Sequence, residues 1–126
     1  MNSTAPGAPS CFTCVQDGDV LIVTFHRPQL TDEDNLELMG EELFRLVEKD
    51  QQRRIVLNLS MVQFVTSSVL GKWITLHRKL ARQSGSMVLC SLQPNVREIL
   101  EASRLLTYFH SAQSVDDAMT LLGSRS

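Results

Sequence analysis

The chain has 126 residues, of which 43% are hydrophobic, and this length and composition suit one compact domain with a buried core. The formal net charge of −2 gives no overall attraction to nucleic acid. No apolar run approaches the roughly 20 residues of a membrane-spanning helix, and no charged leader precedes an apolar block. We therefore expect no signal peptide and no membrane span, with a flexible tail at residues 1–10 and one domain at residues 11–126.

The first predicted elements form a hairpin. Residues 11–16 and 19–26 have the composition of strands, and Asp17-Gly18 between them is a strong short turn signal. The second strand is apolar on both faces, as expected for an inner strand of a sheet. Pro28 then interrupts the strand pairing.

An amphipathic helix follows the hairpin. Residues Thr31 to Asp34 give a start that resembles a capping box, and the helix is predicted to end near Asp50. Charged residues occupy its other face, which we interpret as a solvated surface. Its apolar face is predicted to contain Leu36, Met39, Leu43 and Leu46.

A short strand at residues 55–59 precedes the second helix. This helix is predicted to begin at Ser67 or Ser68 and to be stopped by Gly85. We expect His77 to be a structural histidine with its hydrogen bonds satisfied. The residues predicted to face inward are Leu70, Trp73, Ile74, His77 and Leu80.

The remaining elements continue the alternation of strands and helices. Residues 87–90 form a strand, Pro94 suits the first turn of a third helix, and Tyr108-Phe109 begin a brief final strand. The third helix is predicted to bury Val96, Ile99 and Leu100. Ser114 and Asp117 resemble a capping box before a last helix with the apolar residues Ala118, Met119, Leu121 and Leu122. The order predicts an α/β fold, with a mixed, mostly parallel sheet of four to five strands and about four helices packed on it.

Three cysteines bear on the cellular compartment. An odd number of cysteines without a secretory leader favours a reducing compartment, and we expect a cytoplasmic protein. Cys11 and Cys14 have the spacing of a metal or redox pair, but strand residues three apart point to opposite faces and no second pair completes a zinc site. We interpret Cys11, Cys14 and Cys90 as ordinary buried or half-buried thiols.

No group of residues indicates an enzyme. The three histidines do not have the helical spacing of a metal site, and neither a Gly-x-Ser-x-Gly motif nor a glycine-rich phosphate loop is present. We therefore expect no catalytic residue, metal or cofactor.

Three consecutive hydroxyl residues, Thr66, Ser67 and Ser68, stand between the apolar strand and the second helix. Helix capping explains them without any further role, because Ser and Thr are favoured N-cap residues. A serine at a helix start also suits a regulatory switch, since free helix N–H groups stabilise a phosphate there.

Residues 58–71, which contain these hydroxyls, resemble the central signature of the STAS domain, in which Asp-Ser-Ser-Gly follows an apolar strand. Thr66 stands where the family has Asp, and Val69 where it often has Gly. Residues 85–97 and 114–118 resemble later blocks of the family, and Arg104-Leu105 falls where many members have Gly-Leu. The signature residues that match are Phe64, Ser67, Ser68, Leu70 and Gly71.

The resemblance implies a bacterial anti-sigma-factor antagonist without enzymatic activity. In such proteins the serine after the signature Asp is phosphorylated by a partner kinase that is itself the anti-sigma factor, and the partner supplies ATP and magnesium. By alignment this serine is Ser67, with Ser68 and Thr66 as less favoured acceptors. The implied docking surface contains Thr66, Ser67, Ser68, Val69 and Lys72. We expect a monomer.

Two other functions fit the same fold. The missing Asp suits a constitutive scaffold or adaptor that binds without a phosphorylation switch. Some STAS-like domains assist lipid or anion transport systems, and the second helix carries the basic residues Lys72, Arg78, Lys79 and Arg82. We interpret these cations as a solvated helix surface.

Overall fold

The computed structural model describes residues 11–31 and 36–123. The expected tail at residues 1–10 and most of the expected helix start at Thr31–Asp34 lie outside the described residues. The elements are β1 (Phe12–Asp17), β2 (Val20–Phe25), β3 (Gln29–Leu30), α1 (Leu36–Glu48), β4 (Arg54–Asn58), β5 (Phe64–Val65), α2 (Ser67–Arg82), β6 (Ser86–Cys90), α3 (Pro94–Ala102), β7 (His110–Ala112) and α4 (Val115–Leu121).

Five strands form the main sheet in the order β1-β2-β4-β6-β7. Strand β1 is antiparallel to β2, and the other neighbouring strands are parallel. Each parallel step crosses over through a helix, as parallel strands require. The predicted α/β fold, with a mostly parallel sheet and four helices in the described part of the chain, is confirmed.

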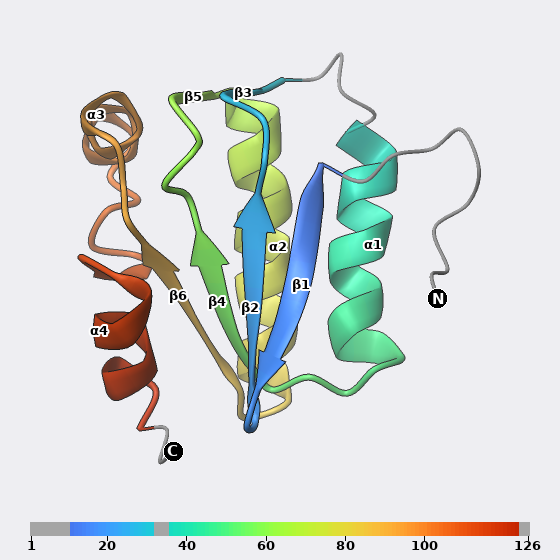
Figure 1. Cartoon of the computed structure of the whole chain (residues 1–126). Helices are drawn as coiled ribbons and strands as arrows, with labels where there is room; N and C mark the ends of the chain where they lie inside the picture. Colours follow the sequence, from blue (N-terminus) through green and yellow to red (C-terminus); the bar gives the residue numbers. More distant parts are fainter. Residues whose placement is uncertain (1–10, 32–35, 124–126) are drawn as a thin grey trace.

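Helices cover the two faces of the sheet unequally. Helices α1 and α2 lie behind the sheet in Figure 1, and α4 lies in front of one side of it. Leu21, Val23 and Phe25 of β2 join the larger core with α1, α2 and α3, while Val20 and Ile22 belong to the smaller cluster under α4. Both faces of β2 are therefore apolar, as predicted for an inner strand.

The hairpin turn differs by one position from the prediction. Asp17 pairs with Val20, so the two central residues are Gly18 and Asp19. Gly18 has a φ of +62°, in the left-handed region that glycine adopts without steric cost. The glycine therefore occupies the first central position of a two-residue turn.

The end of α2 corrects the predicted role of Gly85. The residue in the left-handed region is Ser84, with a φ of +60°. The amide of Ser84 donates to Ala81 O at 3.1 Å and that of Gly85 to Leu80 O at 2.7 Å, the pattern of a Schellman motif. Gly85 is needed for a different reason, because a Cβ atom there would lie 2.4 Å from the carbonyl oxygen of Arg53.

Several residues on the helices also differ from the prediction. On α2, Leu76 is buried and was missed, whereas Ile74 and His77 are only half-buried. On α4, the apolar Leu121 is 59% exposed, whereas Ala118 is buried. The last strand begins at His110, after the predicted Tyr108-Phe109.

Candidate functional site at the start of helix α2

Thr66 is the N-cap residue of α2. Its backbone is extended (φ −90°, ψ 166°), and its Oγ1 accepts a hydrogen bond from the Val69 amide at 3.4 Å. The Leu70 amide donates to the Thr66 carbonyl at 3.1 Å, which closes the first helical turn. The capping role expected of the hydroxyl cluster therefore falls to the residue that replaces the Asp of the signature. Asp and Thr are both favoured at this position.

Ser67 and Ser68 are the first two residues of α2, and both are exposed. In the part of the chain that the structure describes, the Ser67 hydroxyl has no hydrogen-bond partner. Both serines lie beside the N–H groups of the first helical turn, where the helix dipole favours negative charge.

Val69 requires a correction. It was expected on the docking surface, but its side chain is only 1% exposed and belongs to the core beneath α2. The cause is helical geometry, since Val69 lies four residues before Trp73 on the buried stripe. A residue larger than glycine here adds to the core and does not enlarge the exposed surface at the start of α2.

A second, two-stranded sheet, which was not predicted, holds the backbone before Ser67. Strands β3 and β5 pair in parallel, with Leu30 opposite Val65. The Thr66 amide donates to Leu30 O at 3.1 Å. The carbonyl of Pro28, expected only to interrupt pairing, accepts from the amides of Gln63 at 2.6 Å and Phe64 at 3.1 Å. The start of α2 is thus tied to the segment that follows β2.

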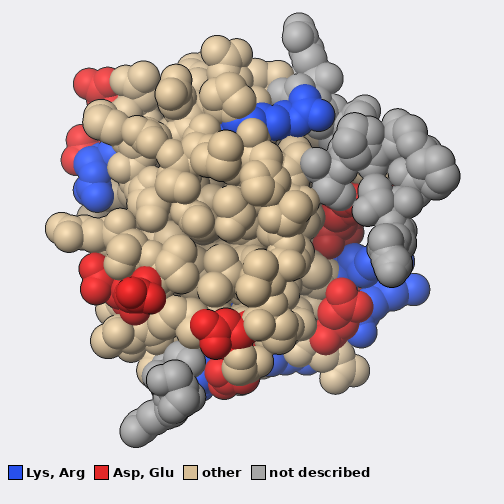
Figure 2. Space-filling view, in the orientation of Figure 1, with Lys and Arg blue, Asp and Glu red and all other residues tan. Residues whose placement is uncertain are grey.

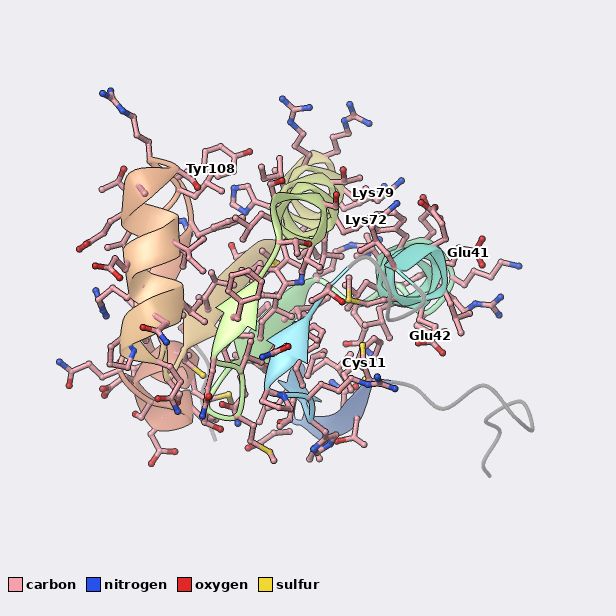
Figure 3. The ribbon with its side chains drawn as sticks, turned by 90° about the horizontal axis from the view of Figure 1, so that it is seen from above. Cys11, Glu41, Glu42, Lys72, Lys79 and Tyr108 are labelled. Carbon is pink, nitrogen blue, oxygen red and sulfur yellow. The ribbon has the colours of Figure 1, made fainter. Side chains whose placement is uncertain are left out.

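Lys72 lies on the side of α2 that faces α1. Figure 3 shows it reaching from α2 toward α1. Its Nζ donates to Glu37 Oε1 at 3.2 Å, and its side chain passes over Gly40, where a Cβ atom would lie 2.9 Å from Lys72 Cδ. Lys72 therefore joins the two helices near the serines, with its charge already opposed by a carboxylate.

Two exposed apolar side chains precede the serines. Met61 is 50% exposed and Phe64 is 44% exposed, although Val62 and Val65 beside them are buried. Sequence analysis recognised Phe64 as a signature residue but did not place either side chain on the surface. We call the surface formed by Met61, Phe64, Thr66, Ser67 and Ser68 the Ser67 edge.

His77, farther along α2, does not have the satisfied hydrogen bonds that we expected. Its Nδ1 is buried and has no hydrogen-bond partner among the described residues. The ring meets the edges of Tyr108 and Phe109, at centroid distances of 5.0 and 5.8 Å. Burial, with a smaller contribution from His110, lowers the pKa of His77 below its usual 6.5.

Among the described residues none of the three cysteines forms a disulfide, and Cys14 differs from the prediction because it is exposed. Cys11 and Cys90 are buried as expected. Desolvation of the sulfur by neighbouring protein atoms, together with the carboxylates of Glu42 and Asp50, raises the pKa of Cys14 to about 11, although the residue as a whole is exposed. Figure 3 shows Glu42 below α1, on the side where Cys11 lies. A thiol with such a pKa is almost entirely protonated, and so unreactive, near neutral pH.

Residues 12–118 match the STAS domain family. A protein of Bordetella bronchiseptica whose name describes it as an anti-sigma factor antagonist, BtrV, is 36% identical over 84 residues, which are 67% of this chain and 72% of that protein. An anti-sigma factor antagonist of Thermotoga maritima has a similar structure, with a TM-score of 0.83 at 22% identity over 90% of this chain and 95% of that chain. The phosphorylated form of SpoIIAA from Bacillus has a TM-score of 0.67 at 17% identity, over 87% of this chain and 97% of that chain. The chain therefore belongs to the STAS domain family.

Proposed function

We propose that this protein is an anti-sigma-factor antagonist that binds an anti-sigma factor with serine kinase activity and is released when Ser67 is phosphorylated. The observation that carries the proposal is the exposed Ser67 at the first position of a 16-residue helix in a STAS domain. The name of the Bordetella relative supports the same class of function.

The Ser67 edge has the features that a docking surface needs. Met61 and Phe64 supply apolar contact area, and interfaces are enriched in such side chains relative to the rest of a surface. The β3–β5 pairing and the Thr66 cap hold the backbone in place before a partner arrives. A preordered surface loses less conformational entropy on binding.

Phosphorylation would change this surface without unfolding it. In the proposed step the Ser67 hydroxyl oxygen attacks the γ-phosphorus of ATP held by the partner, ADP leaves, and the hydroxyl proton passes to a base of the partner. The product adds up to about two negative charges beside the first-turn amides of α2, which tolerate them. The same charges would stand next to Phe64 in the apolar contact and would oppose binding.

Thr66 alters the energetics of this step compared with the Asp of the family signature. A neutral hydroxyl at position 66 repels the incoming phosphate less than a carboxylate would. It also removes a charge that a kinase could recognise. We therefore expect specificity for the partner to depend on the apolar residues of the Ser67 edge more than on a carboxylate at position 66.

Titration calorimetry with the partner kinase tests the proposal. Ser67→Ala should bind as the wild type does but should not dissociate after ATP is added, whereas Ser67→Asp should bind at least tenfold more weakly. Ser68→Ala is the matched control and should behave as the wild type in both conditions. Mass spectrometry of the wild type after reaction should place the phosphate on Ser67.

Two results would contradict the phosphorylation switch. Phosphate found on Ser68 or Thr66 would show that one of these residues, and not Ser67, is the phosphorylation site. Equal affinity of Ser67→Ala and Ser67→Asp would favour the constitutive scaffold or adaptor.

The transport alternative receives less support from the surface of α2. Two of its four basic residues are engaged with α1, since Lys72 pairs with Glu37 and Lys79 pairs with Glu48. Lys79 also lies 5.2 Å from the centre of the Phe44 ring. In the described residues no helix is long and apolar enough to cross a membrane. Specific NMR shifts along α2 on titration with a nucleotide or lipid would revive this alternative.

A further inference from the structure

The connection between β4 and β5 carries Met61 to the surface on a tight turn at residues 59–62, which we call the 59–62 turn. The Val62 amide donates to Leu59 O at 3.0 Å and closes this turn. Leu59 and Val62 are fully buried, whereas Ser60 and Met61 between them are exposed. The buried ends fix the turn in the core, so the contacts of its exposed centre decide how Met61 is presented.

Two side-chain amides hold the centre of the 59–62 turn. The Ser60 amide donates to Asn58 Oδ1 at 3.1 Å, and Gln93 Nε2 donates to Ser60 O at 2.5 Å. Asn58 Nδ2 in its turn donates to Thr24 Oγ1 on β2 at 3.4 Å. The exposed centre is therefore linked to β2 on one side and to the start of α3 on the other.

Gln93 is an unusual residue for the position that it occupies. It is the N-cap residue of α3, and its side chain makes no capping hydrogen bond among the described residues. Thr66 and Ser114, the N-cap residues of α2 and α4, each accept a hydrogen bond from the amide three residues later. Ser, Thr, Asp and Asn are favoured at this position because their short side chains reach those amides. The longer side chain of Gln93 instead reaches the 59–62 turn.

The backbone at Gln93 does not depend on its side chain. Pro94 is the first residue of α3, and a residue before proline is restricted to extended conformations, as observed here (φ −70°, ψ 154°). Leu92 and Val96 on either side pack in the core, and the Arg97 amide donates to Gln93 O at 2.9 Å. A substitution of Gln93 should therefore leave the start of α3 in place.

The surroundings of this contact are uncharged. Residues 58–71 and 90–96 contain no Asp, Glu, Lys or Arg. Figure 2 shows a mainly uncharged surface along the upper edge of the molecule, where β3 and β5 lie in Figure 1. Because few charges are available there to orient a partner, we expect recognition to depend on where the apolar side chains are held.

We propose that Gln93 is a positioning residue of the Ser67 edge, which holds Met61 in the orientation that the partner kinase contacts. The inference rests on the proposed function, because the partner is the same anti-sigma factor with serine kinase activity. Without the hydrogen bond from Gln93 to Ser60 O, the centre of the 59–62 turn would gain freedom. The partner would then have to order Met61 on binding, at a cost in affinity.

Hydrogen exchange in the free protein tests whether Gln93 holds the turn. In Gln93→Ser, exchange of the Val62 amide should accelerate about tenfold, the factor for loss of one hydrogen bond, while amides of β4 and α2 should not change. Gln93→Glu, which keeps the shape but has no donor, should show the same acceleration. Unchanged exchange at Val62, or faster exchange throughout the chain, would overturn the proposal.

Urea unfolding of the same variant separates positioning from general stability. Serine supplies the N-cap side chain that α3 lacks, so the urea midpoint of Gln93→Ser should equal or exceed that of the wild type. A lower midpoint would show that Gln93 supports the whole fold, and would overturn its assignment to the 59–62 turn.

Calorimetry with the partner kinase tests whether Gln93 acts through Met61. Gln93→Ser and Met61→Ala should each weaken binding about three- to tenfold. The double variant should bind no more weakly than Met61→Ala alone, because the two residues act as a unit. Asn95→Ser is the matched control, since Asn95 is exposed in the first turn of α3, and it should bind as the wild type does.

The binding data distinguish this inference from the proposed function. Additive losses in the double variant would show that Gln93 contacts the partner directly, and would overturn its positioning role. An equal loss in Asn95→Ser would do the same. Absence of binding by the wild type would instead refute the proposed function and the docking role together, while the exchange of Val62 would still decide whether Gln93 holds the turn.

Discussion

The two ends of helix α2 are built by different means. At its start, a side-chain hydroxyl of Thr66 caps the helix, and the next two residues are exposed. At its end, backbone groups alone close the helix, and Gly85 lies so close to Arg53 that no side chain fits. Exposed side chains at the first end can be substituted or modified, whereas the close contact between Gly85 and Arg53 excludes any side chain at the second. We therefore expect that the exposed Ser67 and Ser68 can be changed with little loss of stability, whereas Gly85 cannot.

The largest effect is expected from Gly85→Ala. The new Cβ would meet the backbone oxygen of Arg53 at 2.4 Å, so β4 or the α2–β6 connection must shift. We expect a loss of about 2–4 kcal/mol in the free energy of unfolding, the range for serious overpacking. Urea unfolding measures it.

Gly71→Ala is the matched control for Gly85→Ala. It adds the same methyl group within α2 where no atom lies within 4 Å. Because alanine is the better helix former, this change should stabilise the protein by about 0.5–1 kcal/mol. Equal effects of the two substitutions would contradict the steric difference.

Thr66→Ala should have an intermediate effect. It removes the N-cap oxygen that accepts the Val69 amide, and the expected loss is about 1 kcal/mol. Ser67→Ala, one residue later, should change the free energy of unfolding by less than about 0.5 kcal/mol, as for an ordinary surface position. If Ser67→Ala proved as destabilising as Thr66→Ala, Ser67 would be part of the cap.

Ser84→Gly should stabilise the other end slightly. The φ of +60° at Ser84 is unfavourable for a side chain and free of cost for glycine. We expect a gain of about 0.5–1 kcal/mol in urea unfolding. Arg104→Gly, at the corresponding position after α3 with a φ of +61°, should give a similar gain.

A dependence of stability on pH is expected from His77, between the two ends. Its pKa is lowered in the folded state, so the unfolded chain takes up the proton first. The stabilisation is therefore complete above pH 6.5, the usual pKa, and is lost as pH falls through the lower folded pKa. The urea midpoint should drop less between pH 7.5 and 5.5 in His77→Phe than in the wild type. An equal drop in both would assign the pH dependence to other groups.

Much of the fold could be predicted because it follows from long periodic segments. Apart from β3 and β5, the strands and helices from Phe12 onward occur in the predicted order. The predicted apolar face of α3 is found, and that of α1 is found in part, because Val47 is buried and was missed while Leu36 and Leu46 are half-buried. Strands β3 and β5 have two residues each, too few to show any alternation. Their pairing depends on contacts between segments more than thirty residues apart, which local patterns do not encode.

The candidate site could be predicted only in part, because the sequence marks the start of α2 but not the exposure of each residue there. Hydroxyl residues before an apolar helix indicate an N-terminus, but they do not say which residue caps it and which is exposed. That assignment follows from the helical phase, which also buries Val69. Exposure of Met61 and Phe64 has no local signal, because apolar residues in a connecting segment resemble core residues until the tertiary contacts are known.

The pairing of β3 with β5 has a consequence for how this protein could change partners. Backbone hydrogen bonds to Pro28 and Leu30 hold the segment that carries Met61 and Phe64. These bonds do not involve the two side chains, so substituting the side chains should leave the backbone in place. Related chains could therefore exchange the two apolar residues and acquire different binding preferences without redesigning the scaffold. Under the proposed function, several such proteins in one cell would be kept to their own partners by the side chains at these two positions.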